Sequence, residues 1–221
     1  MNVNATSLRR YTLFLRFRNL KRPSIAKALF LTGILCAFQH VEAQSTRQLQ
    51  KAWGLADQQA QLLYKELQLL KKRDSSLVSP RTLSTDNELV AVKRADWTSG
   101  FFPGVLWFLY EKSGKQQWKD LASETTRSIE AEQFNGKTHD MGFKIYCSVG
   151  NGYRLTADPQ YREVLVQAAK TLATRFNPTV GCIRSWDHNS HRWDFPVIID
   201  NMLNLELLFE ATKLTGDSTY Y

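Results

Sequence analysis

The amino-acid sequence predicts an all-α fold in which amphipathic helices alternate with helices that are apolar nearly all round. Three segments place their apolar residues at steps of three and four, which is typical of a helix that buries one face. Three further segments, one after each of these, lack a polar face and are therefore expected to be buried on most sides. This alternation indicates helical hairpins arranged in two concentric layers, with the amphipathic helices outside.

The amphipathic helices are predicted, in chain order, over residues 49–70, 118–129 and 161–176. The first ends in the basic run Lys71-Lys72-Arg73, which suits the negative end of a helix dipole. The apolar helices are predicted over residues 101–110, 143–149 and 202–209. Residues 74–96 are polar and include Pro80, so a loop is expected there.

A weak internal repeat supports the hairpins. Each apolar helix ends in a short turn, after which an aromatic residue opens the next amphipathic segment, at Trp118, Tyr161 and Tyr220. Such recurring turns are typical of helix-pair repeats, although an ordinary bundle could show them by chance because glycine is common after helices. Trp107 and Trp118 fit the apolar pattern and are expected in the core.

Residues 1–43 are expected to be a signal peptide. They hold seven Lys or Arg and one acidic residue, so the net charge of +8 lies mostly in this segment. Basic residues precede the apolar run 28–38, and Val41-Glu42-Ala43 offers small residues for cleavage. An uncleaved anchor is the alternative, but the run is too short for a bilayer span of about twenty residues.

Residues 44–221 are therefore expected in the periplasm or secreted, with no stable membrane insertion after cleavage. Their nearly balanced charge leaves no basic stripe, which argues against a nucleic-acid partner. Cys147 and Cys182 match no zinc or redox spacing. They are expected to be core thiols, and whether they pair in a disulfide stays open.

Two aspartates stand directly before apolar helices: Asp140 before the second and Asp200 before the third. Burying a carboxylate without a partner costs several kcal/mol, so such a pair predicts a shared cleft and acid/base chemistry. Equivalent ends of inner helices face one side of a ring, which would bring both carboxylates to one pocket. The alternative is that each carboxylate merely caps its helix.

Aromatic residues accompany the two aspartates at Trp97, Trp186 and Trp193. Their flat faces suit sugar rings, and helix N-termini favour anionic groups, so the combination predicts a uronic acid as ligand. His139, beside Asp140, is either a ligand contact or a structural hydrogen-bond partner. Asp187 is a loop carboxylate of either kind.

Five motifs occur in a fixed order: DWTSGFFPG at 96–104, HDMGF at 139–143, GNGYRLT at 150–156, RSWD at 184–187 and IDNMLNL at 199–205. Together they resemble the unsaturated glucuronyl hydrolases, glycoside hydrolase family 88, from about Asp96 to Tyr221. The resemblance implies an (α/α)6 toroid, of which residues 44–221 would form about the N-terminal half. The missing C-terminal half, or self-association, is then expected to be needed.

The same resemblance implies roles for individual residues. The catalytic acid/base falls on Asp200, the second essential aspartate on Asp140, and sugar contacts fall on Trp97, His139 and Trp186. The implied substrate is an oligosaccharide left by a polysaccharide lyase, of glycosaminoglycan type, with a 4,5-unsaturated uronic acid at its non-reducing end. Protonation at C4 and addition of water at C5 would give a hemiketal that opens, with no metal or organic cofactor.

Two other functions stay open on the sequence. Two carboxylates can also cleave a saturated glycosidic bond directly, with retention or inversion according to their separation. Alternatively, the chain is an inactive fragment or a non-catalytic glycan binder. Loss of the C4=C5 double bond of the substrate separates these from the hydration reaction.

Overall fold

The computed structural model describes the backbone of residues 25–221 and the side chains of residues 46–221. The predicted signal peptide, residues 1–43, therefore lies outside the residues whose side chains are described, and it stays a prediction. Within the described part of the chain, none of the helices has both the length and the apolarity of a membrane span. The chain divides into two units, residues 1–51 and 52–221, of which the second holds the features described below.

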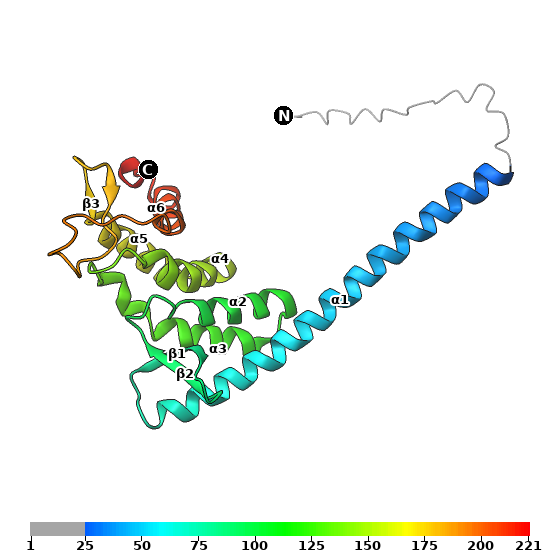
Figure 1. Ribbon diagram of the computed structural model, residues 1–221, viewed down its shortest axis with the longest axis horizontal. Coiled ribbons are helices and arrows are strands. Elements are labelled where there is room, and N and C mark those ends of the chain that lie inside the picture. Colours follow the sequence, from blue (N-terminus) through cyan, green and yellow to red (C-terminus); the bar gives the residue numbers. More distant parts are fainter. Residues whose placement is uncertain (1–24) are drawn as a thin grey trace, which may run out of the picture. The chain divides into compact units, whose positions relative to one another are not determined.

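Helices dominate the second unit, in the predicted order (Figure 1). The α-helices are α1 (Ile25–Lys71), α2 (Phe101–Ser113), α3 (Gln116–Arg127), α4 (Asn151–Thr156), α5 (Pro159–Ala173) and α6 (Asn201–Thr215). They are joined by the 3-10 helices η1 (Glu130–Phe134) and η3 (Ser218–Tyr220) and by the π-helix η2 (Gly142–Gly150). The predicted all-α class is confirmed.

The helices form two rows. In the inner row, α2 contacts η2, and η2 contacts α6. In the outer row, α3 packs on α2, and α5 packs on both η2 and α6. The later part of α1 joins the outer row, where Asp57 accepts hydrogen bonds from Lys115 and Trp118. This is the predicted concentric arrangement, seen over part of a ring.

The prediction of a loop over residues 74–96 is wrong in part. Among the described residues there are two antiparallel pairs, β1 (Leu77–Leu83) with β2 (Leu89–Lys93) and β3 (Phe176–Asn177) with β4 (Cys182–Ile183). The first hairpin turns at Asn87, whose φ of 62° lies in the left-handed region that asparagine tolerates. Pro80 fits because each strand of a two-stranded sheet is an edge strand. The polar composition concealed the β-branched run of β2.

The core lies between the two rows. Trp107 and Trp118 are both fully buried, as predicted, and the Trp107 indole N–H donates to Thr126 Oγ1 at 3.0 Å. Leu165 and Leu172 of α5 are also fully buried. The side chains of an amphipathic outer helix and an apolar inner helix therefore share one core. Cys147 and Cys182 are half-buried free thiols.

The inner row buries only one of its sides. Phe101, Val105 and Phe108 of α2 stay exposed on one stripe, as do Met202 and Leu203 of α6. Beyond α6, an apolar cavity of about 740 Å³ is lined by α6, the β3–β4 hairpin and the end of the chain. These helices are apolar on all sides, but they are buried only on the side that faces the outer row.

Candidate active site

Two loops, which precede η2 and α6, meet at the ends of the inner helices. Thr138 forms an isolated antiparallel bridge with Trp186, and the His139 N–H donates to the Ser185 carbonyl at 3.1 Å. The Ser185 N–H in turn donates to the Pro196 carbonyl at 2.8 Å. Backbone pairing therefore places residues about fifty positions apart in the sequence beside each other.

His139, Asp140 and Asp200 form one cluster in these loops. His139 Nε2 lies 3.2 Å from Asp140 Oδ1 and 3.9 Å from Asp200 Oδ1. One nitrogen or oxygen of each group lies within 4.8 Å of the others, so the three side chains face one another. The 3.2 Å contact is within hydrogen-bonding distance, so Asp140 is a direct partner of the buried imidazole and Asp200 lies farther from it.

The electrostatics distinguish the two carboxyl groups. Burial raises the pKa of Asp140, but hydrogen bonds from His139 and Thr138, with the charges of His139 and Lys144, outweigh it and lower the pKa. Burial lowers the pKa of His139, but hydrogen bonds to Asp140 and Asn201, with the charges of Asp140 and Asp200, raise it above its usual value. Both shifts favour the pair of an imidazolium and an ionised Asp140.

The capping alternative does not describe either aspartate. Asp200 occupies the N-cap position of α6, yet its side chain makes no capping hydrogen bond. The N-cap of η2 is Met141 rather than Asp140, and Asp140 Oδ2 accepts from Thr138 Oγ1 at 2.5 Å. No described group hydrogen-bonds Asp200 Oδ1, although this oxygen is buried. Asp200 is thus the carboxyl group with free hydrogen-bonding capacity.

A buried ion pair lies behind Asp140. Lys144 of η2 is fully buried, and its Nζ lies 2.7 Å from Glu132 Oε2. Asn135 Nδ2 also donates to Glu132 Oε2 at 2.7 Å, and the Lys144 N–H donates to the Asp140 carbonyl at 3.0 Å. π-helices are rare and frequent at functional sites. Here η2 carries the Lys144 ammonium group one turn beyond Asp140.

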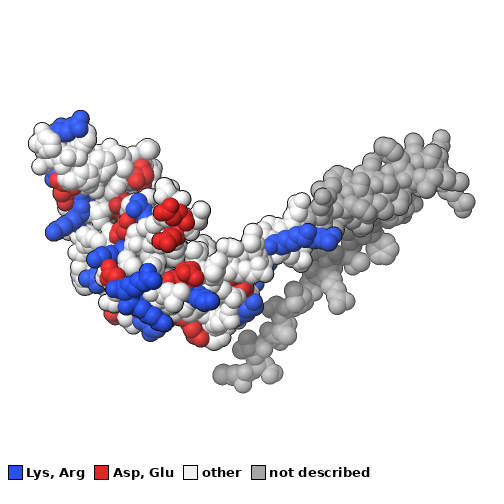
Figure 2. Space-filling view, turned by 60° about the horizontal axis from the view of Figure 1, so that its bottom comes forward, with Lys and Arg blue, Asp and Glu red and all other residues white. Residues whose placement is uncertain are grey.

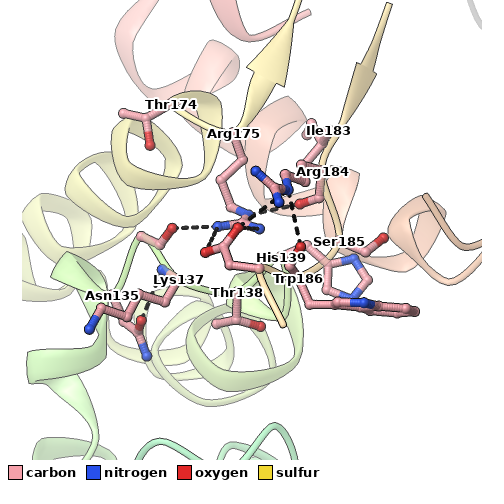
Figure 3. Close-up of polar contacts among 12 residues, drawn as sticks. Asn135, Lys137, Thr138, His139, Thr174, Arg175, Ile183, Arg184, Ser185 and Trp186 are labelled. Atoms are coloured by element: carbon pink, nitrogen blue, oxygen red, sulfur yellow. Dashed lines mark hydrogen bonds and ion pairs between the residues drawn. The ribbon is translucent and has the colours of Figure 1, made fainter. Parts of the chain in front are cut away.

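Arg175 organises the loop that carries Trp186 (Figure 3). Its guanidinium forms a two-pronged pair with Asp187, at 3.1 and 3.0 Å. It also donates to the Arg184 carbonyl at 2.7 Å and to the Gly136 carbonyl at 2.6 Å. Hydrogen bonds from Arg175 lower the pKa of Asp187. Asp187 is therefore a structural carboxylate, and Arg175 joins the loops on either side of the cluster.

Trp186 joins the cluster, and Trp97 lies outside it. The Trp186 ring is edge-on to His139, with centroids 6.5 Å apart, and stacks on His188 at 5.1 Å. Trp193 lies edge-on to Trp186 at 6.4 Å. Trp97 instead packs edge-on against Phe101 and Phe143, each at 5.7 Å, and is half-exposed. It is connected to the site only through the first turn of η2.

The structure thus brings together four of the five predicted site residues, His139, Asp140, Asp200 and Trp186. Sequence reasoning missed Lys144, Arg175 and Asn201. Lys144 lies within an apolar run. Arg175 lies just after a helix, where a basic residue usually interacts favourably with the negative end of the helix dipole. Asn201 was noted in the sequence only as part of the IDNMLNL motif at 199–205.

The surface carries charges of both signs. Figure 2 shows Lys and Arg interspersed with Asp and Glu over the visible face of the described part. Several charged side chains of the described residues form ion pairs, as Arg154 does with Glu111 at 2.6 Å. This face therefore offers no extended basic stripe of the kind that binds nucleic-acid backbones.

Comparisons with known proteins agree with the resemblance. The chain is 55% identical over 144 residues to an unsaturated glucuronyl hydrolase of Formosa agariphila, covering 64% of this chain and 36% of that protein. A crystal structure of an unsaturated glucuronyl hydrolase specific for heparin matches with a TM-score of 0.65 and 38% identity, over 76% of this chain and 44% of that one.

A variant of the Streptococcus agalactiae unsaturated glucuronyl hydrolase complexed with dGlcA-GalNAc6S matches with a TM-score of 0.54 and 25% identity, over 75% of this chain and 39% of that one. No family model matches the chain. The chain spans about 36% of the length of the curated relative. The resemblance to unsaturated glucuronyl hydrolases is confirmed for the part that the chain covers.

Proposed function

We propose that this chain supplies the acid/base part of an unsaturated glucuronyl hydrolase site, which removes a 4,5-unsaturated uronic acid from the non-reducing end of an oligosaccharide. The observation that carries the proposal is the His139–Asp140–Asp200 cluster, in which Asp140 is hydrogen-bonded to His139 and Thr138 and the buried Asp200 Oδ1 makes no hydrogen bond to any described group. The similarity to proteins named unsaturated glucuronyl hydrolase supports the same reaction.

Asp200 acts as the acid. Asp140 is held as a carboxylate by His139 and Thr138, so it lacks a proton to give. In its protonated form, Asp200 donates its proton to C4 of the vinyl ether, and positive charge develops at C5 and the ring oxygen. Water then adds at C5 and gives a proton to the Asp200 carboxylate, which restores the acid.

The product of this addition is a hemiketal at C5. It opens, the ring is lost, and the neighbouring sugar leaves with its hydroxyl group. Each step balances, because the substrate gains one water molecule and Asp200 ends protonated as it began. The hydrogen bonds of the cluster fix the negative charge of Asp140, and a preorganised negative charge of this kind would stabilise the positive charge that develops at C5 and the ring oxygen.

The aromatic groups supply the sugar contacts. Trp186 and Trp193 stand beside the cluster, and flat rings of this kind pack against sugar faces. Trp97 would contact the substrate from the α2 side of the pocket. Further contacts would come from the rest of a longer protein or from a second copy, because the inner row is exposed along one side.

Export to the periplasm or to the medium is part of the proposal. The proposal of a signal peptide rests on the basic and apolar pattern of residues 1–43. Fusion of residues 1–60 to a reporter enzyme that folds only outside the cytoplasm tests it. Reporter activity with cleavage after Ala43 is expected, and an uncleaved or cytoplasmic reporter would contradict it.

The ultraviolet absorbance of the conjugated C4=C5 carboxylate tests the reaction. Unsaturated glycosaminoglycan disaccharides should lose this absorbance with the wild-type chain, and Asp200→Asn should lower the rate by about 10²-fold or more. Asp120→Asn, on the exposed surface of α3, is the matched control and should keep the wild-type rate. Tight binding of the disaccharides with unchanged absorbance would instead indicate a non-catalytic glycan binder.

A further inference from the structure

Asn201, the first residue of α6, is buried between the two loops of the site. Its Nδ2 donates to the Ile183 carbonyl at 2.8 Å and to Ser185 Oγ at 3.3 Å. Its Oδ1 faces His139 Nδ1, with which it forms a hydrogen bond. Asn201 therefore touches the histidine of the cluster from the side opposite to the two aspartates.

The hydrogen-bond network fixes which way round the Asn201 amide lies. A backbone carbonyl can only accept, so the group that faces the Ile183 carbonyl must be the NH₂. In the flipped orientation, Oδ1 would face that carbonyl and two acceptors would meet in a buried site. Ser185 is also fully buried and accepts from the Ile198 N–H at 3.1 Å. Oδ1 is thus committed to His139.

The hydrogen bond between Asn201 Oδ1 and His139 Nδ1 determines which ring nitrogens of His139 carry a proton. Because Asn201 Oδ1 can only accept, His139 Nδ1 must carry a proton. A neutral ring with Nδ1–H would then point the bare lone pair of Nε2 at Asp140 Oδ1, 3.2 Å away. A proton on Nε2 removes this clash and makes a charge-assisted hydrogen bond.

We propose that Asn201 is a positioning residue that acts through His139, by holding Nδ1–H so that the imidazole is retained as a cation between Asp140 and Asp200. The proposal deepens the proposed function and rests on it for its catalytic meaning, but its structural content stands on the hydrogen bonds alone. The cation pairs with Asp140 and keeps it ionised, whereas Asp200 Oδ1 lies farther from the ring, at 3.9 Å, and hydrogen-bonds to none of the described residues.

The charged groups that face the ring are few. Asp140 and Asp200 face Nε2, and both favour the cation. From η2, Lys144 acts on Asp140 but is itself paired with Glu132. From the other side, Trp186 contributes an uncharged ring.

Nitrogen-15 NMR of the histidine-labelled full chain tests the proposal without any need for catalysis. In the wild type at pH 7, both ring nitrogens of His139 should resonate as protonated imidazolium nitrogens, with His139→Gln identifying the signals. In Asn201→Leu, which cannot accept from Nδ1, the ring should become the neutral Nε2–H tautomer, with Nδ1 shifted to the unprotonated range. The exposed His188 and His191 are internal controls and should not change.

Asn201→Asp is the conservative variant, because a carboxylate still accepts from Nδ1 while it loses the donation to Ile183. It should retain the imidazolium even if Asn201→Leu fails to fold. A wild-type ring with one unprotonated nitrogen, or a neutral ring in Asn201→Asp, would overturn the proposal. So would a folded Asn201→Leu with an unchanged imidazolium.

Kinetics then separate this inference from the proposed function. Where the wild type turns over unsaturated disaccharides, Asn201→Leu should lower kcat at least about tenfold, with KM changed within about twofold. If the wild type shows the imidazolium but no turnover, the proposed function fails and the positioning role of Asn201 stands. If the wild type turns over the disaccharides without the imidazolium, the proposed function stands and the positioning role of Asn201 fails.

Discussion

Gly142 of η2 lies so close to Asn204 of α6 that a Cβ at Gly142 would stand 2.7 Å from the Asn204 Cα. Across the same contact, the Phe143 N–H donates to Asn204 Oδ1 at 3.2 Å. Asn204 Nδ2 in turn donates to the Asp200 carbonyl at 3.4 Å. This contact fixes the distance between the two helices whose preceding residues are the site aspartates.

Gly142→Ala is therefore expected to destabilise the chain by about 1–3 kcal/mol, because backbone lies where the new methyl group would go. Urea unfolding measures the change. Gly54→Ala is the control: Gly54 lies in α1 with nothing within 4 Å of an added Cβ, and the change should stabilise by about 0.5–1 kcal/mol. Equal effects of the two substitutions would contradict the close-contact account.

Lys144→Met is expected to cost about 3–5 kcal/mol, because it leaves Glu132 as a buried charge without its main partner. The double variant Lys144→Met with Glu132→Leu should recover much of this loss, since no buried charge then remains. The matched control is Arg154→Met, which breaks a half-exposed pair with Glu111 and should cost less than about 1 kcal/mol. A loss no larger than that of the control would show that Lys144 is not buried as described.

The stability of the chain should depend on pH through the cluster. The pKa of His139 is raised on folding from 6.5, so its contribution is complete below pH 6.5 and is lost as the pH rises through the folded pKa. The pKa of Asp140 is lowered from 3.8, so its contribution is complete above pH 3.8 and is lost as the pH falls through the folded pKa.

The difference in unfolding free energy between the wild type and His139→Gln should accordingly be largest between pH 3.8 and 6.5 and should shrink on both sides. Denaturant unfolding at a series of pH values measures it. His191→Gln, in the exposed loop, serves as the reference variant. A difference that grows above pH 6.5 would mean that folding favours the neutral imidazole.

Arg175→Lys should release the loop that carries Trp186, although the charge is kept. A lysine ammonium cannot make the two-pronged pair with Asp187 and also reach the Arg184 and Gly136 carbonyls. Faster amide exchange of residues 184–198 and a loss of at least about 1 kcal/mol are expected. Arg192→Lys is the control, because Arg192 lies over the Trp193 ring on the exposed loop, and unchanged exchange in Arg175→Lys would refute the anchoring role.

The local pattern of the sequence was enough to predict the helices. Apolar steps of three and four reflect the geometry of one turn, so α3 and α5 could be placed without knowledge of their partners. The β1–β2 hairpin was missed because Pro80 and the polar residues around the strands suggested a loop, although β2 itself is mostly apolar. Val90 and Val92, which follow Asn87 at the turn, were the available signals.

The two carboxylates of the site could be predicted from the sequence, but the residues that hold the site together could not. Asp140 and Asp200 stand out because each precedes a helix expected to be buried, and Asp is rarely buried without a partner. Lys144 and Arg175 depend on partners, Glu132 and Asp187, that only the tertiary fold brings into contact. The role of Asn201 depends on the direction of one amide, which follows from the Ile183 carbonyl and from nothing in the sequence.

The central claim is that Asp200 donates a proton to C4, and deuterium uptake tests it most directly. Unsaturated disaccharides turned over in D₂O should give a uronic acid product that carries one deuterium at C4, as seen by NMR, and Asp200→Asn should abolish its formation. A released uronic acid without deuterium at C4, or an undiminished deuterium signal in Asp200→Asn, would contradict the account.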